Sequence, residues 1–475
     1  MIKTSIACLA ARTVRAALRM MGKGATTLPG KIALKIDPDI ISRKAEGKNI
    51  ITVTGTNGKT TTAHMISDMI SSMGINVINN ISGANLQTGV ATTLVCEKGR
   101  GDDMYVLEVD EAAFAKIAGS LGPKVCVVTN LFRDQLDRYG ELTHTRDLIA
   151  SGIAKTGAKV ILNADDSLVA SIGDGIEDRC VFFGMDKVSM KENNEKYPPR
   201  KGVIPASPDA VFCPVCKVRY EYRAHSFGHL GDFYCPACGF RSPDSRFEVI
   251  YDLGTSPSND DYEYKIRDSL SGTTVDMKQK VPGTHNLYNT CAAISAVTVF
   301  TEALKGREGD ADLFRSSCAS QDHVSAAFGR MEKIDIDGKK LCIFLVKNPI
   351  GLDRALTFIA DSNDKASLMM LLSSNFADGK DVSWIWDVDF ESKAEDLPSN
   401  IAVSGQRYAD MQLRLEYAGV TVGRSGPNDK AIEILRELID ECPQGGCVYV
   451  LPTYTAMLSL RAGLVRELGL KEFWK

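Results

Sequence analysis

The chain has 475 residues, 44% of them hydrophobic, and a formal net charge of −4. This length fits two or three globular domains, and the slightly acidic charge argues against a nucleic-acid partner, which usually needs a basic face. No apolar run approaches the ~18 residues of a membrane-spanning helix. Of the 13 cysteines, four form two C-x-x-C pairs and the rest are scattered, which predicts a reducing, cytoplasmic environment with one metal site.

The first segment, Ile2 to Met21, is predicted to be a helix. Arg12, Arg15 and Arg19 interrupt its apolar residues, and a secretory signal has an uncharged core, so a signal peptide is excluded. The arginines recur at helical spacing on one face. Two interpretations remain: a helix packed against the protein, or one resting on an anionic membrane surface, which would place the protein peripherally at the inner face of a membrane.

Strands and helices then alternate along the chain. The β-branched segment Asn49–Thr54 leads into a glycine loop, and Thr61–Met73 follows as a predicted helix. Alternation of this kind predicts an α/β domain with a parallel sheet. Further strands are predicted at Ile75–Ile78, Tyr105–Val109, Val125–Thr129 and Val160–Asn163.

The composition changes at residues 193–258, where prolines cluster and both cysteine pairs occur, so this segment is predicted to be an insertion. Strand-like alternation returns at Phe247–Tyr251, and Asn286–Leu304 is predicted to be a long helix. A second α/β unit begins near Gly329, with helices such as Lys430–Ile439. Its strands are predicted at Leu341–Val346, Ser367–Leu372, Ile401–Ser404, Val420–Val422 and Cys447–Leu451.

The glycine loop has the features of a phosphate-binding loop. Gly58, Lys59 and Thr60 match the end of the pattern G-x-x-x-x-G-K-[ST], although Val53 stands where the first glycine is expected. Backbone N–H groups at a helix N-terminus bind phosphate. We expect Lys59 to neutralise the β- and γ-phosphates of ATP and Thr60 to ligate Mg²⁺. The predicted nucleotide-binding residues of the loop are Thr56, Asn57, Gly58, Lys59, Thr60 and Thr61.

The sequence T-G-T-N-G-K-T-T-T resembles the loop of the Mur ligase superfamily, which includes folylpolyglutamate synthase and couples ATP to amide-bond formation through an acyl phosphate. The resemblance implies that Glu108, in the motif Leu107–Glu111, is a Mg²⁺ ligand, since hard cations take carboxylate oxygens beside phosphates. It also implies that Asn286 and Asn289, three apart on one helix face, reach the adenine base. Arg330 is then expected to reach the nucleotide phosphates on domain closure.

The segment Thr129–Asp137 resembles the superfamily motif T-N-x-x-x-D-H-L-D with one departure. Gln135 replaces the usual histidine, and a neutral amide cannot act as an imidazole ligand or base.

The two cysteine pairs indicate a metal site. Four thiolates suit tetrahedral Zn²⁺, and a closed four-cysteine set leaves no open position for catalysis. We therefore predict a structural zinc ribbon. Its ligands are expected to be Cys213, Cys216, Cys235 and Cys238.

A Mur-type core with an inserted four-cysteine ribbon resembles the MurT family, the ligase-like subunits of lipid II isoglutaminyl synthase. Gln135 is the variant that this family uses, and Lys347–Gly351 and Asn375–Asp387 resemble its C-terminal domain. The resemblance implies amidation of the α-carboxylate of D-glutamate in the stem peptide of lipid II, at the membrane surface. D-isoglutamine would form through an acyl phosphate.

The ammonia would come from a second chain, since the sequence offers no cysteine on a glycine-flanked elbow with a histidine partner. The resemblance implies a GatD-type glutaminase subunit in a heterodimer. It also implies that Asp381 is a catalytic aspartate that assists the partner's Cys–His pair. Asp378 and Asp387 lie close in sequence, and Asp381 capping a turn is the alternative.

The sequence thus predicts an α/β protein in three parts. These are a Mur ligase-type ATP-binding domain with an N-terminal helical segment at 1–325, an inserted ribbon at 205–245 and a C-terminal Rossmann-like domain at 326–475. Two other functions stay open: a muramyl- or folyl-type ligase that adds an amino acid, and a zinc-ribbon binding protein whose phosphate loop is a switch.

Overall fold

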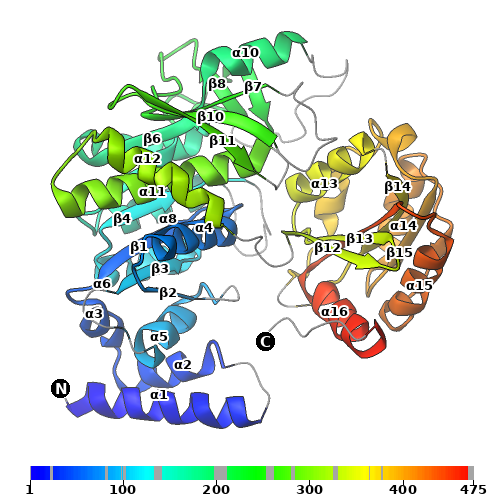
Figure 1. Cartoon of the computed structure of the whole chain (residues 1–475), viewed down its shortest axis with the longest axis horizontal. Coiled ribbons are helices and arrows are strands. Elements are labelled where there is room, and N and C mark those ends of the chain that lie inside the picture. The colour runs from blue at the N-terminus through cyan, green and yellow to red at the C-terminus, as the bar shows by residue number, and fades with distance from the viewer. Residues whose placement is uncertain are drawn as a thin grey trace. The chain divides into compact units, whose positions relative to one another are not determined.

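The computed structural model describes residues 2–21, 25–80, 84–97, 99, 103–132, 142–196, 211–252, 262–279, 284–324, 330–362, 364–375 and 378–468. These residues form two compact units, one before residue 325 and one after it, and each is described by itself (Figure 1).

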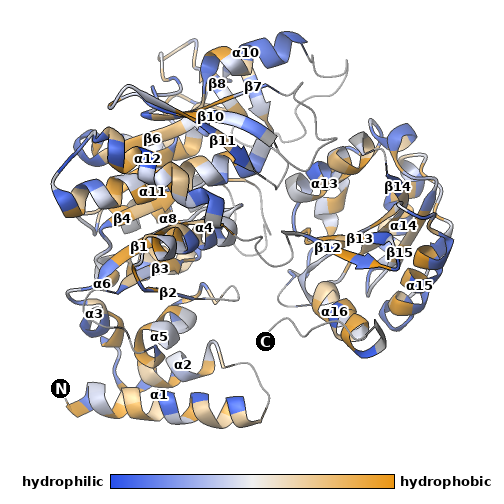
Figure 2. Ribbon diagram, viewed as in Figure 1, coloured by the Kyte–Doolittle hydropathy of each residue, from blue (hydrophilic) through white to orange (hydrophobic). Residues whose placement is uncertain are grey.

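A twisted sheet forms the centre of the first unit. Its inner strands are parallel, in keeping with their almost continuously buried, β-branched residues. Figure 2 shows these strands as largely hydrophobic ribbons. Their order is β2 (Val77–Asn79), β3 (Met104–Glu108), β1 (Asn49–Thr54), β4 (Val125–Val128), β5 (Lys159–Asn163) and β6 (Cys180–Met185), followed by β9 (Phe247–Tyr251) and the antiparallel β10 (Tyr262–Asp268) and β11 (Thr273–Gln279).

Helices cover both faces of this sheet. One face carries α4 (Lys59–Ser72), α11 (Thr284–Lys305) and α12 (Ala311–Ser320), which contact each other. The other face carries α5 (Gln87–Cys96), α6 (Glu111–Leu121) and α8 (Leu142–Ile153), with α3 (Ile40–Ala45) against α5 and α6. Beyond them lie α2 (Leu28–Ile36) and α1 (Ile2–Met20).

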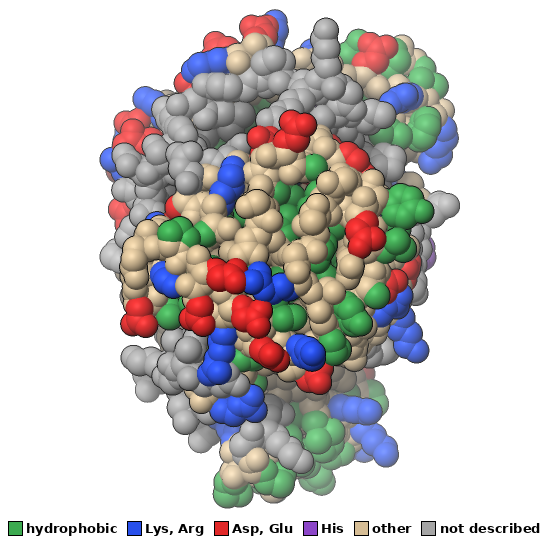
Figure 3. All heavy atoms as spheres, turned by 90° about the vertical axis from the view of Figure 1, so that its right-hand side faces the viewer, with side chains coloured by type: hydrophobic (Ala, Val, Ile, Leu, Met, Phe, Trp, Pro, Cys, Tyr) green, Lys and Arg blue, Asp and Glu red, His purple; other side chains and the backbone are tan. Residues whose placement is uncertain are grey.

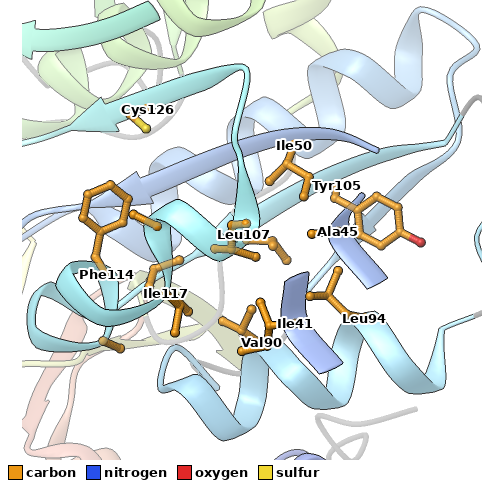
Figure 4. Packing of buried hydrophobic residues seen from close by; sticks show 14 of the residues in the cluster. Ile41, Ala45, Ile50, Val90, Leu94, Tyr105, Leu107, Phe114, Ile117 and Cys126 are labelled. Atoms are coloured by element: carbon orange, nitrogen blue, oxygen red, sulfur yellow. The ribbon is translucent and has the colours of Figure 1, made fainter. Parts of the chain in front are cut away.

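The core on this second face joins strands and helices that are distant in sequence. Figure 4 shows Ile50 of β1 and Leu107 of β3 packed with Phe114 of α6 and Val90 of α5. These side chains are fully or almost fully buried. Strands β1 and β3, which lead to the predicted nucleotide site, are thereby held by dense packing.

The insertion is a small separate sheet on this unit. Strands β7 (Glu221–Phe227) and β8 (Leu230–Tyr234) form an antiparallel hairpin after α9 (Ser167–Ala170) and α10 (Lys187–Lys196).

The second unit is a Rossmann-like α/β sandwich. Its sheet has the order β12 (Arg330–Ile336), β13 (Lys339–Phe344), β17 (Cys447–Pro452), β14 (Lys365–Leu371), β15 (Asn400–Ser404) and β16 (Arg424–Ser425), parallel except for β12. One face packs on α13 (Pro349–Asp361) and α14 (Tyr408–Tyr417), and the other on α15 (Ala431–Glu441) and α16 (Tyr454–Leu468).

The predicted α/β class with parallel sheets is confirmed, and one predicted strand is wrong. Val420–Val422 is not a strand, because Gly419 has a φ of 74° and the Val420 N–H returns to the carbonyl oxygen of Leu415 at 2.9 Å. These residues terminate α14 in the manner of a helix C-cap. The edge strand β16 begins only at Arg424.

Among the described helices, α11 alone is long and apolar enough to cross a membrane. However, 89% of the apolar window in α11 is buried inside the protein. The apolar composition of α11 is therefore explained by its burial in the first unit.

Candidate functional site

The predicted phosphate loop connects β1 to α4 in the first unit. Gly55 and Gly58 have φ angles of 118° and 82°, which favour glycine. A Cβ atom on Gly55 would lie 2.5 Å from Thr129 Oγ1, and one on Gly58 would lie 2.1 Å from Asn289 Oδ1. Backbone conformation and close approach therefore both require glycine here.

Lys59 is buried beneath the loop, with 7% of its surface exposed. Its ammonium group donates to the carbonyl oxygens of Gly55 and Thr56 and pairs with Glu111 (Nζ–Oε1 2.9 Å). Burial disfavours the charged form, but the carboxylates of Glu111 and Glu108 outweigh this effect and raise the pKa of Lys59. Lys59 is thus a fixed positive charge at the base of the loop.

Glu108 ends β3 beside the start of α4. Thr60 Oγ1 donates to Glu108 Oε2 at 2.8 Å, and Asn85 Nδ2 donates to Oε1 at 2.9 Å. Asn80 holds the backbone of Glu108 through two hydrogen bonds, of 2.9 Å to its N–H and 2.7 Å to its carbonyl. A hydroxyl and a carboxylate at this distance form an oxygen donor pair that suits Mg²⁺.

A second loop, which follows β4, supports the phosphate loop. The N–H groups of Asn57 and Thr56 donate to the side chain and the carbonyl of Asn130, at 2.9 and 2.7 Å. Thr129 Oγ1 donates to the Asn57 carbonyl at 2.8 Å. The Thr56 hydroxyl accepts from the Phe132 N–H at 3.0 Å. The conformation of the phosphate loop therefore depends on these residues.

Asn286 and Asn289 lie in the first turns of α11 and are buried. Thr62 Oγ1 of α4 donates to Asn289 Oδ1 at 3.4 Å, and Asn289 Nδ2 is 3.4 Å from Asn286 Oδ1. The structure thus brings both asparagines beside the phosphate loop. Contact with adenine stays a prediction.

The nucleotide site fits Mg²⁺ and ATP by its donor set. Thr61 Oγ1, in the first turn of α4, is buried and has no hydrogen-bond partner among the described residues. A phosphate oxygen would satisfy this hydroxyl, as expected at a helix N-terminus. Thr60 and Glu108 would hold the cation, and Lys59 would supply the positive charge.

The four predicted metal ligands are brought together by two turns. Their Sγ atoms all lie within 4.8 Å of one another. The distances are 3.6 Å for Cys213–Cys238 and 3.3 Å for Cys216–Cys235. Sulfurs of a tetrahedral zinc site with bonds of ~2.3 Å lie about 3.8 Å apart. The arrangement therefore fits a closed metal site.

Both cysteine turns have the same backbone design. Lys217 and Gly239, which follow the second cysteine of each pair, have φ angles of 64° and 79°. Their N–H groups donate to the carbonyl oxygens of Cys213 and Cys235 at 2.9 and 3.0 Å. A small aromatic core lies beside the turns, formed by Tyr220, Phe233 and Phe240.

The β7–β8 hairpin connects the four-cysteine cluster to the loop after β4, which supports the phosphate loop. Phe227 and His229, at the hairpin tip, pack on Phe132 with ring centroids 5.7 and 4.6 Å away. Asp166 Oδ2 accepts from the Leu131 N–H at 2.7 Å and lies 3.5 Å from His229 Nε2. The ribbon and the nucleotide site therefore share a set of packed residues.

Asp381 lies in the second unit and is exposed, while its Oδ1 accepts from the Ser383 N–H at 2.8 Å. Asp378 is buried, and its carboxylate accepts from the backbone N–H and hydroxyl of Thr455 at the start of α16. Asp387 is exposed. The structure thus engages Asp378 internally and leaves Asp381 and Asp387 accessible, with Asp381 also bonded to a turn.

Arg330 begins β12 of the second unit, and its side chain lies outside the described residues. Gln135 also lies outside them.

Comparison with known proteins separates the possible ligase families. Residues 53–206 match the Mur ligase middle domain, and residues 345–457 match the MurT ligase C-terminal domain. The subunit MurT of lipid II isoglutaminyl synthase (glutamine-hydrolyzing) from Streptococcus pneumoniae is 34% identical, over 99% of each chain. The MurT subunit from Staphylococcus aureus is 30% identical, over 96% of this chain and 97% of its own.

The chain belongs to the MurT family. It is a ligase of the Mur type, and Mur ligases use ATP and Mg²⁺. The predicted Mur ligase fold is confirmed by solved structures of low sequence identity. A pseudomurein peptide ligase type C from Methanothermus fervidus has a TM-score of 0.67 and 20% identity, covering 91% of this chain and 81% of that one. MurF from Acinetobacter baumannii has a TM-score of 0.63 and 16% identity, covering 92% and 81%.

Several residues of this MurT-family site were not predicted to act there. Glu111 holds Lys59, and the asparagines Asn80 and Asn85 hold Glu108, although Glu111 lies in the motif Leu107–Glu111 that carries the family resemblance. Their positions after predicted strands were a usable signal, because side chains at the carboxyl ends of parallel strands converge. The contact of His229 with the loop after β4 has no signal in the sequence.

Proposed function

We propose that this chain is the ATP-dependent ligase subunit of a lipid II isoglutaminyl synthase. The observation that carries the proposal is the likeness to MurT subunits along 96% to 99% of the chain. The geometry of the phosphate loop supports it, since Lys59, Thr60 and Glu108 form one cluster.

In this proposal the α-carboxylate of D-glutamate in the stem peptide of lipid II attacks the γ-phosphate of ATP. An acyl phosphate and ADP form. Ammonia then attacks the acyl carbon, phosphate leaves, and D-isoglutamine results. Lys59 stabilises the negative charge on the phosphates, and Thr60 and Glu108 would hold the Mg²⁺ ion, which would supply further positive charge. Asn286 and Asn289 contact the adenine side, and Arg330 contributes to the phosphates.

We further propose that ammonia comes from a GatD-type glutaminase subunit, because the relatives are named as subunits of a glutamine-hydrolyzing enzyme. Asp381 then acts through the partner by orienting and charging its catalytic histidine. The exposure of Asp381 supports this role.

We also propose that the four cysteines hold a structural zinc ion in an inserted ribbon at 205–245. The ATP-binding domain would span 1–325 and the C-terminal domain 326–475. The protein would work in the cytoplasm, on a substrate held at the inner face of the membrane.

The test uses the purified full chain with a GatD-type subunit, lipid II, ATP and glutamine. Mass spectrometry should show ADP and a lipid II product of slightly lower mass, since an amino group replaces a hydroxyl group. Lys59→Ala should lower the amidation rate by at least about a hundredfold, because the buried ammonium group that stabilises the phosphate charge in the transition state is lost.

Two results would contradict the proposal. A product heavier by a whole amino acid would indicate a muramyl- or folyl-type ligase instead. Full amidation by Lys59→Ala would show that the phosphate loop does not activate the carboxylate. Lys44→Ala, on a partly exposed helical lysine outside the site, is a matched control and should keep the wild-type rate.

A further inference from the structure

The N-terminal helix α1 has two different faces. Ala7, Cys8 and Ala11 are buried against the first unit, where α1 contacts α2 and α5. Figure 1 shows α1 at the edge of this unit, with α2 and α5 on one side of it. The opposite face of α1 is covered by no described element of the unit.

That outer face carries an apolar stripe. Ile2, Ile6, Leu9 and Met20 are 78%, 53%, 70% and 83% exposed. Positions four, seven and eighteen residues after Ile2 share one face of a helix. Figure 2 shows hydrophobic and hydrophilic residues alternating along α1. Isolated exposed apolar residues are ordinary, but a helical stripe of them indicates a binding surface.

Basic residues flank the stripe. Lys3, Arg12 and Arg19 of α1 are exposed, and the helix contains no acidic residue. Lys31 and Lys35 of α2 are exposed as well. At the lower edge of Figure 3, where α1 lies, hydrophobic and basic side chains adjoin. The surface around the stripe is thus complementary to an anionic partner.

We propose that α1 lies in the headgroup region of an anionic lipid bilayer, with Ile2, Ile6 and Leu9 inserted among the acyl chains. A helix with an apolar stripe, a basic border and no acidic residue has the composition of interfacial helices. Charge complementarity favours the bilayer over a second copy docked through the same face, because that contact would bring two basic borders together. A lipid-linked substrate also requires contact with a membrane, an argument that rests on the proposed function.

The helix α5 joins this surface to the nucleotide site. Asn85, two residues before α5, bonds to Glu108, the predicted Mg²⁺ ligand. Near the other end of α5, Arg12 Nε donates to the Val95 carbonyl at 3.0 Å, and Arg15 pairs with Glu97. A helix of 10 residues is ~15 Å long. Membrane contact through α1 would therefore hold the predicted Mg²⁺ site at a fixed height above the bilayer.

The experiment measures co-sedimentation of the full chain with phosphatidylcholine vesicles, with and without phosphatidylglycerol. We expect binding to the phosphatidylglycerol vesicles that weakens as salt concentration rises. The double variant Ile6→Gln/Leu9→Gln should lose at least about tenfold in affinity because the inserted apolar area is lost. Lys3→Glu/Arg19→Glu should lose a similar factor on anionic vesicles only.

The matched control removes exposed apolar side chains from other helices. Val188 of α10 and Leu413 of α14 are 65% and 48% exposed, and Val188→Gln/Leu413→Gln should bind vesicles like the wild type. Unfolding midpoints of all variants should match, since only exposed positions change.

Binding of the wild type to neither vesicle, or equal binding by Ile6→Gln/Leu9→Gln, would overturn the proposal. So would a concentration-dependent dimer, or a complex with the glutaminase subunit, that this variant abolishes. Amidation assays distinguish the membrane proposal from the proposed function. The variant Ile6→Gln/Leu9→Gln should amidate lipid II in vesicles more slowly than the wild type, and should amidate a water-soluble analogue at the wild-type rate. A wild type that binds vesicles and amidates neither substrate would contradict the function alone.

Discussion

Asp165 is a carboxyl group buried in the first unit, between the nucleotide site and the ribbon. Its Oδ2 accepts from the Tyr288 hydroxyl at 2.6 Å and from the Met185 N–H at 2.8 Å. Burial outweighs these hydrogen bonds and raises the pKa of Asp165 to about 7. The folded protein therefore favours the protonated form of Asp165 below about pH 7.

This raised pKa predicts that the stability of the folded protein decreases as pH rises. An unfolded aspartate has a pKa of ~3.9, so the folded state binds the proton more tightly. The contribution of Asp165 is therefore complete below about pH 4 and is lost as pH rises through about 7, by up to roughly 4 kcal/mol. Asp165→Asn cannot ionise, and urea unfolding between about pH 4 and 8 should show a smaller decline for it. Equal pH slopes in both proteins would contradict the prediction.

At the residue scale, the sequence identified groups whose chemistry is carried by a local motif. Lys59, Thr60 and Glu108 are brought together as expected, because a strand–loop–helix unit and a neighbouring strand end fix their positions. The residues that hold them were not predicted. Contacts such as Thr56 with Phe132 depend on tertiary packing that local spacing does not encode.

At the scale of elements, the ribbon hairpin and the phosphate loop are mechanically connected. The tip of β7–β8 packs on Phe132, which is hydrogen-bonded to Thr56 of the loop. A metal that fixes the cysteine turns would thereby stabilise the loop that follows β4. The proposed structural zinc would then affect nucleotide affinity without touching the nucleotide.

We therefore expect removal of the metal to weaken ATP binding by roughly tenfold, a usual size for coupling between sites. Titration with a fluorescent ATP analogue before and after chelation, alongside measured zinc content, checks this. The variant Phe227→Ala keeps the cysteines but removes the ring that stacks on Phe132. Chelation should therefore change the ATP affinity of this variant less than that of the wild type. Unchanged affinity in metal-free protein whose first unit remains folded would exclude the coupling.

Strand prediction succeeded where β-branched residues are continuously buried, as in β1 and β17. It failed at Val420–Val422, where the same residue types follow a left-handed glycine that ends α14. The pair β10–β11 was missed because its strands alternate with charged residues, as expected for an antiparallel edge exposed on one face. The parallel strand β6 was also not predicted although it lies inside the sheet, so apolar content identified most but not all of the buried parallel strands.

At the scale of the whole molecule, the proposed reaction needs a second chain that supplies ammonia. The second unit is an α/β sandwich distinct from the first, and the MurT-family match at 345–457 lies within it. Asp381 occupies an exposed turn of this unit, beside a 3-10 helix at Ser383–Asp387. Such a position allows a carboxylate to complete the active site of a partner.

We expect Asp381→Asn to abolish glutamine-dependent amidation while amidation with free ammonium chloride stays at the wild-type rate. Loss of the charge that orients an imidazole should lower glutaminase turnover by at least about a hundredfold. Glutamate release by the two-chain complex, and product formation with each nitrogen source, measure the two steps separately. Asp387→Asn, on an exposed neighbouring carboxylate, should leave both rates unchanged.

Asp378→Asn distinguishes a structural effect from a role in the partner's active site. Asp378 is bonded to Thr455 at the start of α16, so its neutralisation should cost about 1 kcal/mol and lower the unfolding midpoint. Asp381→Asn should unfold like the wild type and still bind the glutaminase subunit. If Asp381→Asn instead reduced both ammonia- and glutamine-dependent amidation equally, Asp381 would serve the fold of the second unit and not the partner.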